Sequence, residues 1–173
     1  MKTGKPAARA RPSNPERSRT GAKIELAVQY ATRSRTVPGE EDFRKWVRAA
    51  MRTNACITIR VVGLEEGRAL NREYRGRDYA TNVLTFVLDD GPPRIGDVAL
   101  CAPVVSREAR EQGKDVIAHY AHLTVHGALH LQGYEHEHEP AATGMEKLET
   151  RILKRLGFPD PYQPTSDHGR HTQ

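Results

Sequence analysis

The sequence predicts an α+β domain in which about five helices pack on a small mixed β-sheet of about four strands. Three observations lead to this fold class. Strand-like and helix-like segments follow one another in the order β-α-β-α-β-β-α-α-α, without an internal repeat. Two neighbouring strands are joined only by a short Asp-Gly-Pro-Pro loop, which is typical of a hairpin. The chain has 173 residues, of which 37% are hydrophobic, and this suits one core better than two.

The first half of the chain alternates two strands with two helices. Residues 23–30 alternate apolar and polar side chains, and residues 55–62 form a β-branched run, so each predicts a strand. Residues 38–51 begin with Pro and acidic residues, as helices often do, and residues 64–78 predict a second helix that ends near Gly76. The side chains expected to face the core are Phe43, Trp46, Val47 and Ala50 in the first helix, and Leu64, Leu70 and Tyr74 in the second.

The second half begins with the predicted hairpin and continues with three helices. Residues 82–93 predict a strand that runs into a turn, and residues 95–101 predict its partner. The helices are expected over residues 103–112, 115–133 and 141–157. The middle one is the longest apolar-periodic segment, so we expect it to be buried, and Gly133 suits its C-terminal end.

Charge and composition divide the chain into three parts. Residues 1–22 hold six basic residues and one Glu, which accounts for the whole net charge of +5. This stretch is rich in Pro, Gly, Ser and Arg, so we expect a disordered basic tail, which either contacts RNA phosphates or is solvated without a function. Residues 23–162 are expected to form the single domain, and residues 163–173 a flexible C-terminal tail.

The sequence favours a cytoplasmic protein without a membrane segment. No apolar run approaches the roughly 18 residues that span a bilayer, and the N-terminus lacks the apolar stretch of a signal peptide. Cys56 and Cys101 lie in apolar strand-like runs without a CxxC pairing, so we expect both to be buried, reduced thiols.

Three histidines near the end of the long helix have the spacing of metal ligands. His126 and His130 are four residues apart and therefore share one helix face, and His136 follows the break at Gly133. Three imidazole nitrogens leave one coordination position open, as in catalytic zinc sites. Three neutral ligands also leave the full charge of the ion, which makes bound water more acidic. We therefore predict one Zn²⁺ per chain, held by these three residues.

The other histidines have weaker claims to the metal. His138 competes with His136 as the third ligand but lies two residues beyond the spacing. His122 shares the ligand face and could donate a hydrogen bond behind the ligands, although a core histidine bonded to the backbone is the simpler role. His119 lies further upstream, and His168 and His171 are expected on the surface of the C-terminal tail.

The residue after His126 argues against peptide hydrolysis. The same histidine spacing occurs in metzincin proteases, where a glutamate at the second position takes a proton from water. Here that position is Gly127. A protease would need a base from elsewhere, so the pattern favours a metal-dependent hydrolase whose substrate is not a peptide.

The stretch HGALHLQGYEH (126–136) resembles the signature of the YbeY family of bacterial endoribonucleases and rRNA maturation factors. The resemblance continues in LNREYRGRDYATNVLTF (70–86), IGDVALC (95–101) and EAREQGK (108–114), with Glu135 where the family usually has Asp. It implies a single-strand-preferring, metal-dependent endoribonuclease that acts in 16S rRNA 3′-end maturation and ribosome quality control. The implied partners are RNA and the small ribosomal subunit with its associated proteins.

The resemblance also implies roles for particular residues. The family's zinc ligands fall on His126, His130 and His136, and its functionally important arginine falls on Arg75. An arginine suits this chemistry because its guanidinium stays charged and can bind two phosphate oxygens. The basic cluster around it consists of Arg68, Arg72, Arg75 and Arg77, and a solvated helix face would look the same. Thr81 and Asn82 could bind substrate, but a cap at the start of the strand is the simpler role.

Two other functions remain open at this point. A non-catalytic ribosome-assembly factor could use zinc only to hold its fold, although structural zinc sites usually have four protein ligands. A metalloprotease is the weaker alternative because of Gly127.

Overall fold

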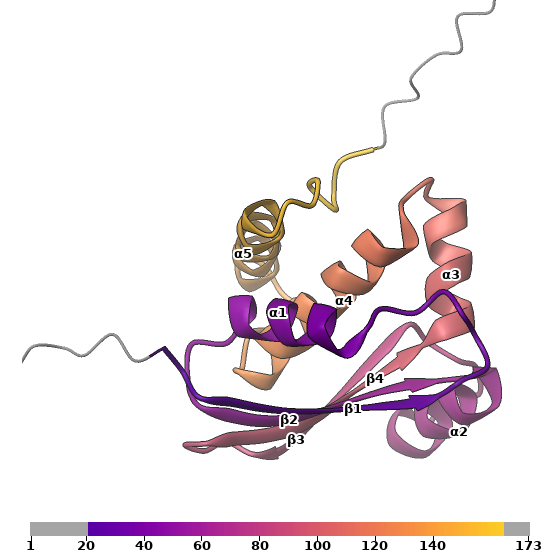
Figure 1. The fold of residues 1–173 in the computed structure, drawn as a ribbon, viewed down its shortest axis with the longest axis horizontal. Helices are drawn as coiled ribbons and strands as arrows, with labels where there is room; N and C mark the ends of the chain where they lie inside the picture. The colour runs from indigo at the N-terminus through magenta and orange to yellow at the C-terminus, as the bar shows by residue number, and fades with distance from the viewer. Residues whose placement is uncertain (1–20, 165–173) are drawn as a thin grey trace, which may run out of the picture.

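A four-stranded mixed sheet forms the base of the computed structural model, which describes residues 21–164 (Figure 1). Its strands are β1 (Ile24–Ala31), β2 (Ala55–Val62), β3 (Val83–Asp89) and β4 (Arg94–Cys101). They lie in the order β1-β2-β4-β3, with β1, β2 and β4 parallel and β3 antiparallel to β4. The predicted mixed sheet and hairpin are confirmed, and β3 is an edge strand.

Five helices complete the predicted α+β fold. They are α1 (Glu40–Ala50), α2 (Leu64–Arg75), α3 (Ala102–Glu111), α4 (Val116–Leu131) and α5 (Ala141–Arg155). Helices α1, α4 and α5 lie on one side of the sheet, and α2 lies on the other (Figure 1). Helix α4 contacts α1, α3, α5, β3 and β4. The main core lies between these elements, so the helix that carries the histidine pattern is held from several sides.

Local signals fix both ends of α4. The Asp115 carboxylate caps its first turn by accepting a hydrogen bond from the Ala118 backbone N–H at 3.0 Å. At the other end Gly133 has a φ of 89°, which favours glycine. The N–H groups of Gly133 and Tyr134 donate to the carbonyls of His130 and Leu129, which is a Schellman motif. The chain therefore turns sharply after α4, as the sequence predicts.

The side chains that α2 buries differ from the prediction. Leu64 and Tyr74 are 52% and 60% exposed, and Leu70 is only partly buried. The buried residues are Gly67 and Asn71, because α2 lies so close to the end of β4 that a Cβ on Gly67 would be 2.9 Å from the Cys101 Sγ. A helix packed through a glycine leaves its larger apolar side chains at the margins of the contact.

The cysteines and termini complete the comparison with the sequence. Cys101 is buried as predicted, whereas Cys56 is only partly buried and its thiol lies 3.6 Å from the Glu25 carboxylate. Within residues 21–164, no helix is long and apolar enough to cross a membrane. Most of the two predicted tails, together with His168 and His171, lies outside the residues that the structure describes.

Candidate metal centre

The turn after α4 brings the three predicted ligands together. His126 and His130 lie one helical turn apart, and their Nε2 atoms are 2.9 Å from each other. The Nδ1 atom of His136 lies 2.8 Å from the His130 Nε2. One ring nitrogen from each histidine thus lies within 4.8 Å of the other two. His138 and Glu135 are exposed and are not part of this group.

The remaining ring nitrogens show that the group suits a cation. The His126 Nδ1 bonds to the Glu149 carboxylate, and the His130 Nδ1 donates to the Tyr134 carbonyl at 2.8 Å. In a neutral imidazole the Nε2 atom then carries a lone pair, and two lone pairs that face each other repel unless a cation or proton lies between them. Nitrogen ligands of tetrahedral zinc lie about 3.3 Å apart, so a small outward shift would accommodate the ion.

The environment of His130 favours the neutral form that binds metals. Burial lowers the pKa of His130 to about 4, and the neighbouring imidazoles of His126 and His136 act in the same direction. A neutral imidazole at neutral pH has a lone pair available for a metal without the loss of a proton.

A buried carboxylate on α5 anchors the group from behind. Glu149 is fully buried and accepts hydrogen bonds from the His126 Nδ1, from the His122 Nε2 at 3.1 Å and from the Tyr162 hydroxyl. Burial alone would raise the pKa of Glu149, but these hydrogen bonds outweigh it and lower the pKa below its usual value. An ionised Glu149 orients His126 so that its Nε2 faces the other two ligands.

Sequence reasoning missed Glu149 although the sequence contains a signal for it. Glu149 shares the apolar face of the last helix with three buried residues, Met145, Ile152 and Leu153. A carboxylate on such a face needs hydrogen-bond donors. The histidines of the long helix are suitable donors.

The Glu149→Gln variant is expected to bind metal about 10- to 100-fold more weakly than the wild-type protein. Three donors meet the carboxylate, and a glutamine would turn its own N–H₂ group toward one of them. Competition with a chromophoric chelator measures the affinity, with Glu146→Gln, an exposed position on the same helix, as control. Equal affinities in the two variants would show that Glu149 does not orient His126.

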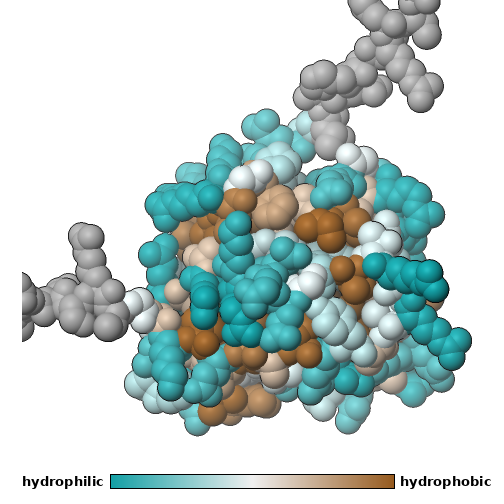
Figure 2. All heavy atoms as spheres, in the orientation of Figure 1, coloured by the Kyte–Doolittle hydropathy of each residue, from teal (hydrophilic) through white to brown (hydrophobic). Residues whose placement is uncertain are grey.

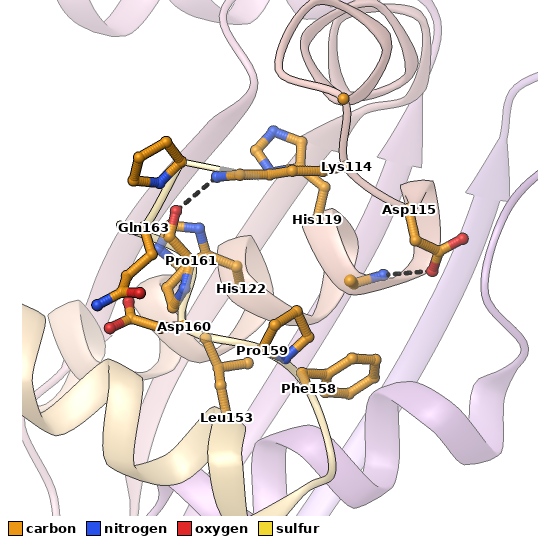
Figure 3. Close-up of a pocket in the computed structure, with 13 residues that line it drawn as sticks. Lys114, Asp115, His119, His122, Leu153, Phe158, Pro159, Asp160, Pro161 and Gln163 are labelled. Carbon is orange, nitrogen blue, oxygen red and sulfur yellow. Dashed lines mark hydrogen bonds between the residues drawn. The ribbon is translucent and has the colours of Figure 1, made fainter. Parts of the chain in front are cut away.

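The segment that carries Tyr162 is held against the start of α4. The Lys114 ammonium donates to the Pro161 carbonyl at 2.6 Å across a pocket of about 400 Å³, and His119 and His122 line the same pocket (Figure 3). The Tyr162 backbone N–H donates to the Asp160 carboxylate at 2.9 Å. Tyr162 is thus held in place at the end of the domain, and its hydroxyl reaches Glu149.

The two upstream histidines of α4 bond to carboxylates. His122 bonds to Glu149, so the expected backbone partner is wrong, and its role behind the ligands is the one that the structure shows. His119 is 4% exposed, and its Nε2 lies 2.8 Å from the Glu108 carboxylate. Glu108 also accepts from the Asn82 amide at 3.0 Å, and the Asn82 carbonyl oxygen accepts from the Val83 N–H. Asn82 therefore caps the start of β3 and ties it to α3.

Packing at Gly127 explains why this position carries no glutamate. A Cβ on Gly127 would lie 3.1 Å from the Val98 Cγ1 and 3.2 Å from the Thr85 Cγ2. The position thus faces the sheet, and a glutamate there would be forced into packed apolar side chains. The site cannot supply the protease base from this residue.

Arg75 lies at the end of α2, on the sheet face opposite α4 (Figure 1). Its side chain is exposed and makes no hydrogen bond or ion pair with any of the residues 21–164. The nearby carboxylate of Asp78 does not pair with Arg75, because it bonds to Arg68 at 2.7 and 2.8 Å. Arg72 lies 3.9 Å from the same carboxylate. A role for Arg75 opposite the metal stays a prediction.

Comparisons with known proteins found related sequences and a similar solved structure. A family model described as Endoribonuclease YbeY matches residues 28–157. A protein named Endoribonuclease YbeY from Nitrosomonas eutropha is 58% identical over 137 residues, which cover 79% of this chain and 97% of the relative. A protein of the same name from Nitrosomonas europaea is 55% identical over 140 residues, covering 81% and 85%. A solution structure from Thermotoga maritima covers 81% of this chain and 99% of its own, with 22% identity and a TM-score of 0.48.

Proposed function

Because the chain belongs to the YbeY family of endoribonucleases, we propose that it is a zinc-dependent endoribonuclease that cleaves single-stranded RNA. The observation that carries this proposal is the convergence of three ring nitrogens, one each from His126, His130 and His136. The other ring nitrogens of His126 and His130 bond to the Glu149 carboxylate and the Tyr134 carbonyl, which leaves the converging nitrogens available to a metal. Three protein groups converge at this point, which leaves room for water and substrate, and the neighbouring group of His122, His126 and Glu149 shares only His126 with it.

The chain's own residues would divide the work of phosphodiester cleavage. When bound, a zinc ion supplies Lewis acidity to a phosphate oxygen and lowers the pKa of water. Glu149 and the Tyr134 carbonyl orient His126 and His130 for ligation. Arg75 has no partner among residues 21–164, so its guanidinium is free to bind phosphate oxygens as negative charge develops in the transition state.

The proposed setting is ribosome biogenesis in the cytoplasm. We propose that the substrate is rRNA, that the reaction contributes to 16S rRNA 3′-end maturation and ribosome quality control, and that the partners are the small subunit and its associated proteins. This part rests on family membership.

Cleavage of single-stranded RNA by the purified protein tests the proposed activity. We expect cleavage that a chelator abolishes and that added Zn²⁺ restores, whereas an unstructured peptide stays intact because the position after His126 is a glycine facing the sheet. The melting curve of the chelated protein separates catalysis from a purely structural metal. If the protein unfolds when the metal is removed, and the metal-loaded protein does not cleave RNA, the results would favour a ribosome-assembly factor instead.

A further inference from the structure

Two aromatic rings meet on the surface where α2 passes β3. The rings of Tyr74 and Phe86 lie with their centroids 4.7 Å apart, and Tyr74 is 60% exposed. We name this pair the aromatic ledge. Leu88, two residues further along β3, is also exposed. Hydrophobic side chains appear in brown at the lower margin of Figure 2, the side on which Figure 1 places β3. The main core does not include the ledge.

The aromatic ledge lies on the face of β3 opposite the one that contacts α4, the helix that carries two of the three histidines. Thr85 faces α4, because its Cγ2 would contact a Cβ on Gly127, the residue after His126. Successive side chains of a strand point to opposite faces, so Phe86 points away from α4 and toward α2. No strand covers the outer side of β3 in the described sheet. A polymer that crosses this edge could therefore contact the ledge on one face and continue toward the metal centre on the other.

The charges around the ledge suit an RNA strand. Arg75 follows Tyr74 directly and has no ion pair within residues 21–164, and Arg72 has only a long contact to Asp78. Arg60, which lines the same depression as the ledge, is neutralised by Glu66 at 2.6 Å. Acidic groups without a described ion pair near the ledge are Asp97 in that depression, the exposed Glu73 and Asp89 at the end of β3. Asp97 disfavours a phosphate over the sheet itself, so the phosphate belongs at Arg75, at the edge.

We propose that the aromatic ledge stacks a nucleotide base of single-stranded RNA next to the cleavage site. Stacking on an exposed aromatic ring is the usual way to hold an unpaired base, and an adjacent arginine holds the backbone. The inference rests on the proposed function, because it concerns the path of the RNA that the metal centre would cleave. It places the flanking base on the α2 side of β3, and the scissile phosphate at the edge of the sheet, between Arg75 and the three histidines.

Binding of a short single-stranded RNA tests the ledge separately from cleavage. Fluorescence anisotropy is measured on chelator-treated protein, which does not cut the probe, and steady-state kinetics on the metal-loaded protein. The variants are Tyr74→Phe, Tyr74→Leu and Tyr74→Ala. Tyr30→Ala is the matched control, because Tyr30 is 47% exposed on β1, at the opposite edge of the sheet. Melting curves identify any variant that loses its fold.

We expect Tyr74→Ala and Tyr74→Leu to bind RNA roughly 5- to 100-fold more weakly than wild type, with a raised KM and nearly unchanged kcat. Tyr74→Phe should bind normally because it keeps the ring, and Tyr30→Ala should not change binding. A 4-thiouridine probe should crosslink to Tyr74 or Phe86 in the wild-type protein.

Two outcomes would overturn the inference in distinguishable ways. Wild-type affinity in Tyr74→Ala, with crosslinks elsewhere, would remove the ledge from the RNA path while the endoribonuclease assignment stands. A wild-type protein that neither binds nor cleaves RNA would overturn the proposed function and the ledge together.

Discussion

Replacement of His130 by alanine is expected to reduce the metal content from about one ion per chain to a small fraction and to abolish RNA cleavage. The His130 Nε2 is the common neighbour of the group, at 2.9 Å from His126 and 2.8 Å from His136. Without it, two histidines from different segments are left, and two nitrogens do not make a zinc site. The expected loss of metal binding is larger than in Glu149→Gln, because Glu149 only orients the ring of His126.

Metal analysis of the purified proteins, with the cleavage rate of each, measures this effect. His138→Ala is the matched control, because His138 is an exposed histidine on the same turn and lies outside the converging group. We expect His138→Ala to keep both metal and activity. The result would contradict our assignment if His130→Ala retained a full complement of metal, or if His138→Ala lost it.

The long helix and the convergence of the three histidines could be predicted because their signals are local. The Asp115 cap, the apolar periodicity and Gly133 lie within one stretch, and together they fix where His126 and His130 point. Gly133 also fixes the turn that brings His136 back toward His126 and His130. No distant residue is needed to predict that the three histidines lie close together, whereas the orientation of the His126 ring depends on Glu149.

The support behind the ligands could not be predicted in the same way because it comes from distant segments. Glu149 and Tyr162 lie 23 and 40 residues from the histidines that they contact, His126 and His122. The sequence shows a carboxylate on an apolar helix face but does not show which donor it meets. Tyr162 follows Pro159 and Pro161 and has no periodic pattern, so only the tertiary contact reveals its position.

The sheet order and the burial of α2 depend on tertiary packing as well. The segments predict four strands, but they do not predict that β4 lies between β2 and β3. The apolar spacing of Leu64 and Tyr74 suggests a helix with a wide buried face. The actual contact is narrow because it passes through Gly67, and Tyr74 is left beside Phe86 at the surface.

The Arg75→Ala variant is expected to cleave RNA about 30- to 1,000-fold more slowly, which corresponds to about 2–4 kcal/mol of transition-state stabilisation. The reason is that a guanidinium without an internal partner can give both arms of its planar fork to phosphate oxygens. Arg75→Lys keeps the charge but not the fork, so it should also be impaired. Arg68→Ala is the matched control, since Arg68 is already paired with Asp78.

Stability and metal content should hardly change in Arg75→Ala, and this separates catalysis from structure. Arg75 is exposed and has no hydrogen bond or ion pair within residues 21–164, so its removal should cost under about 0.5 kcal/mol of folding free energy. The deciding measurement is the cleavage rate per metal-loaded molecule together with a melting curve. A full rate in Arg75→Ala would remove Arg75 from the active site. A low rate with unchanged melting and metal content would place its guanidinium on the substrate, on the path that leads from the aromatic ledge to the three histidines.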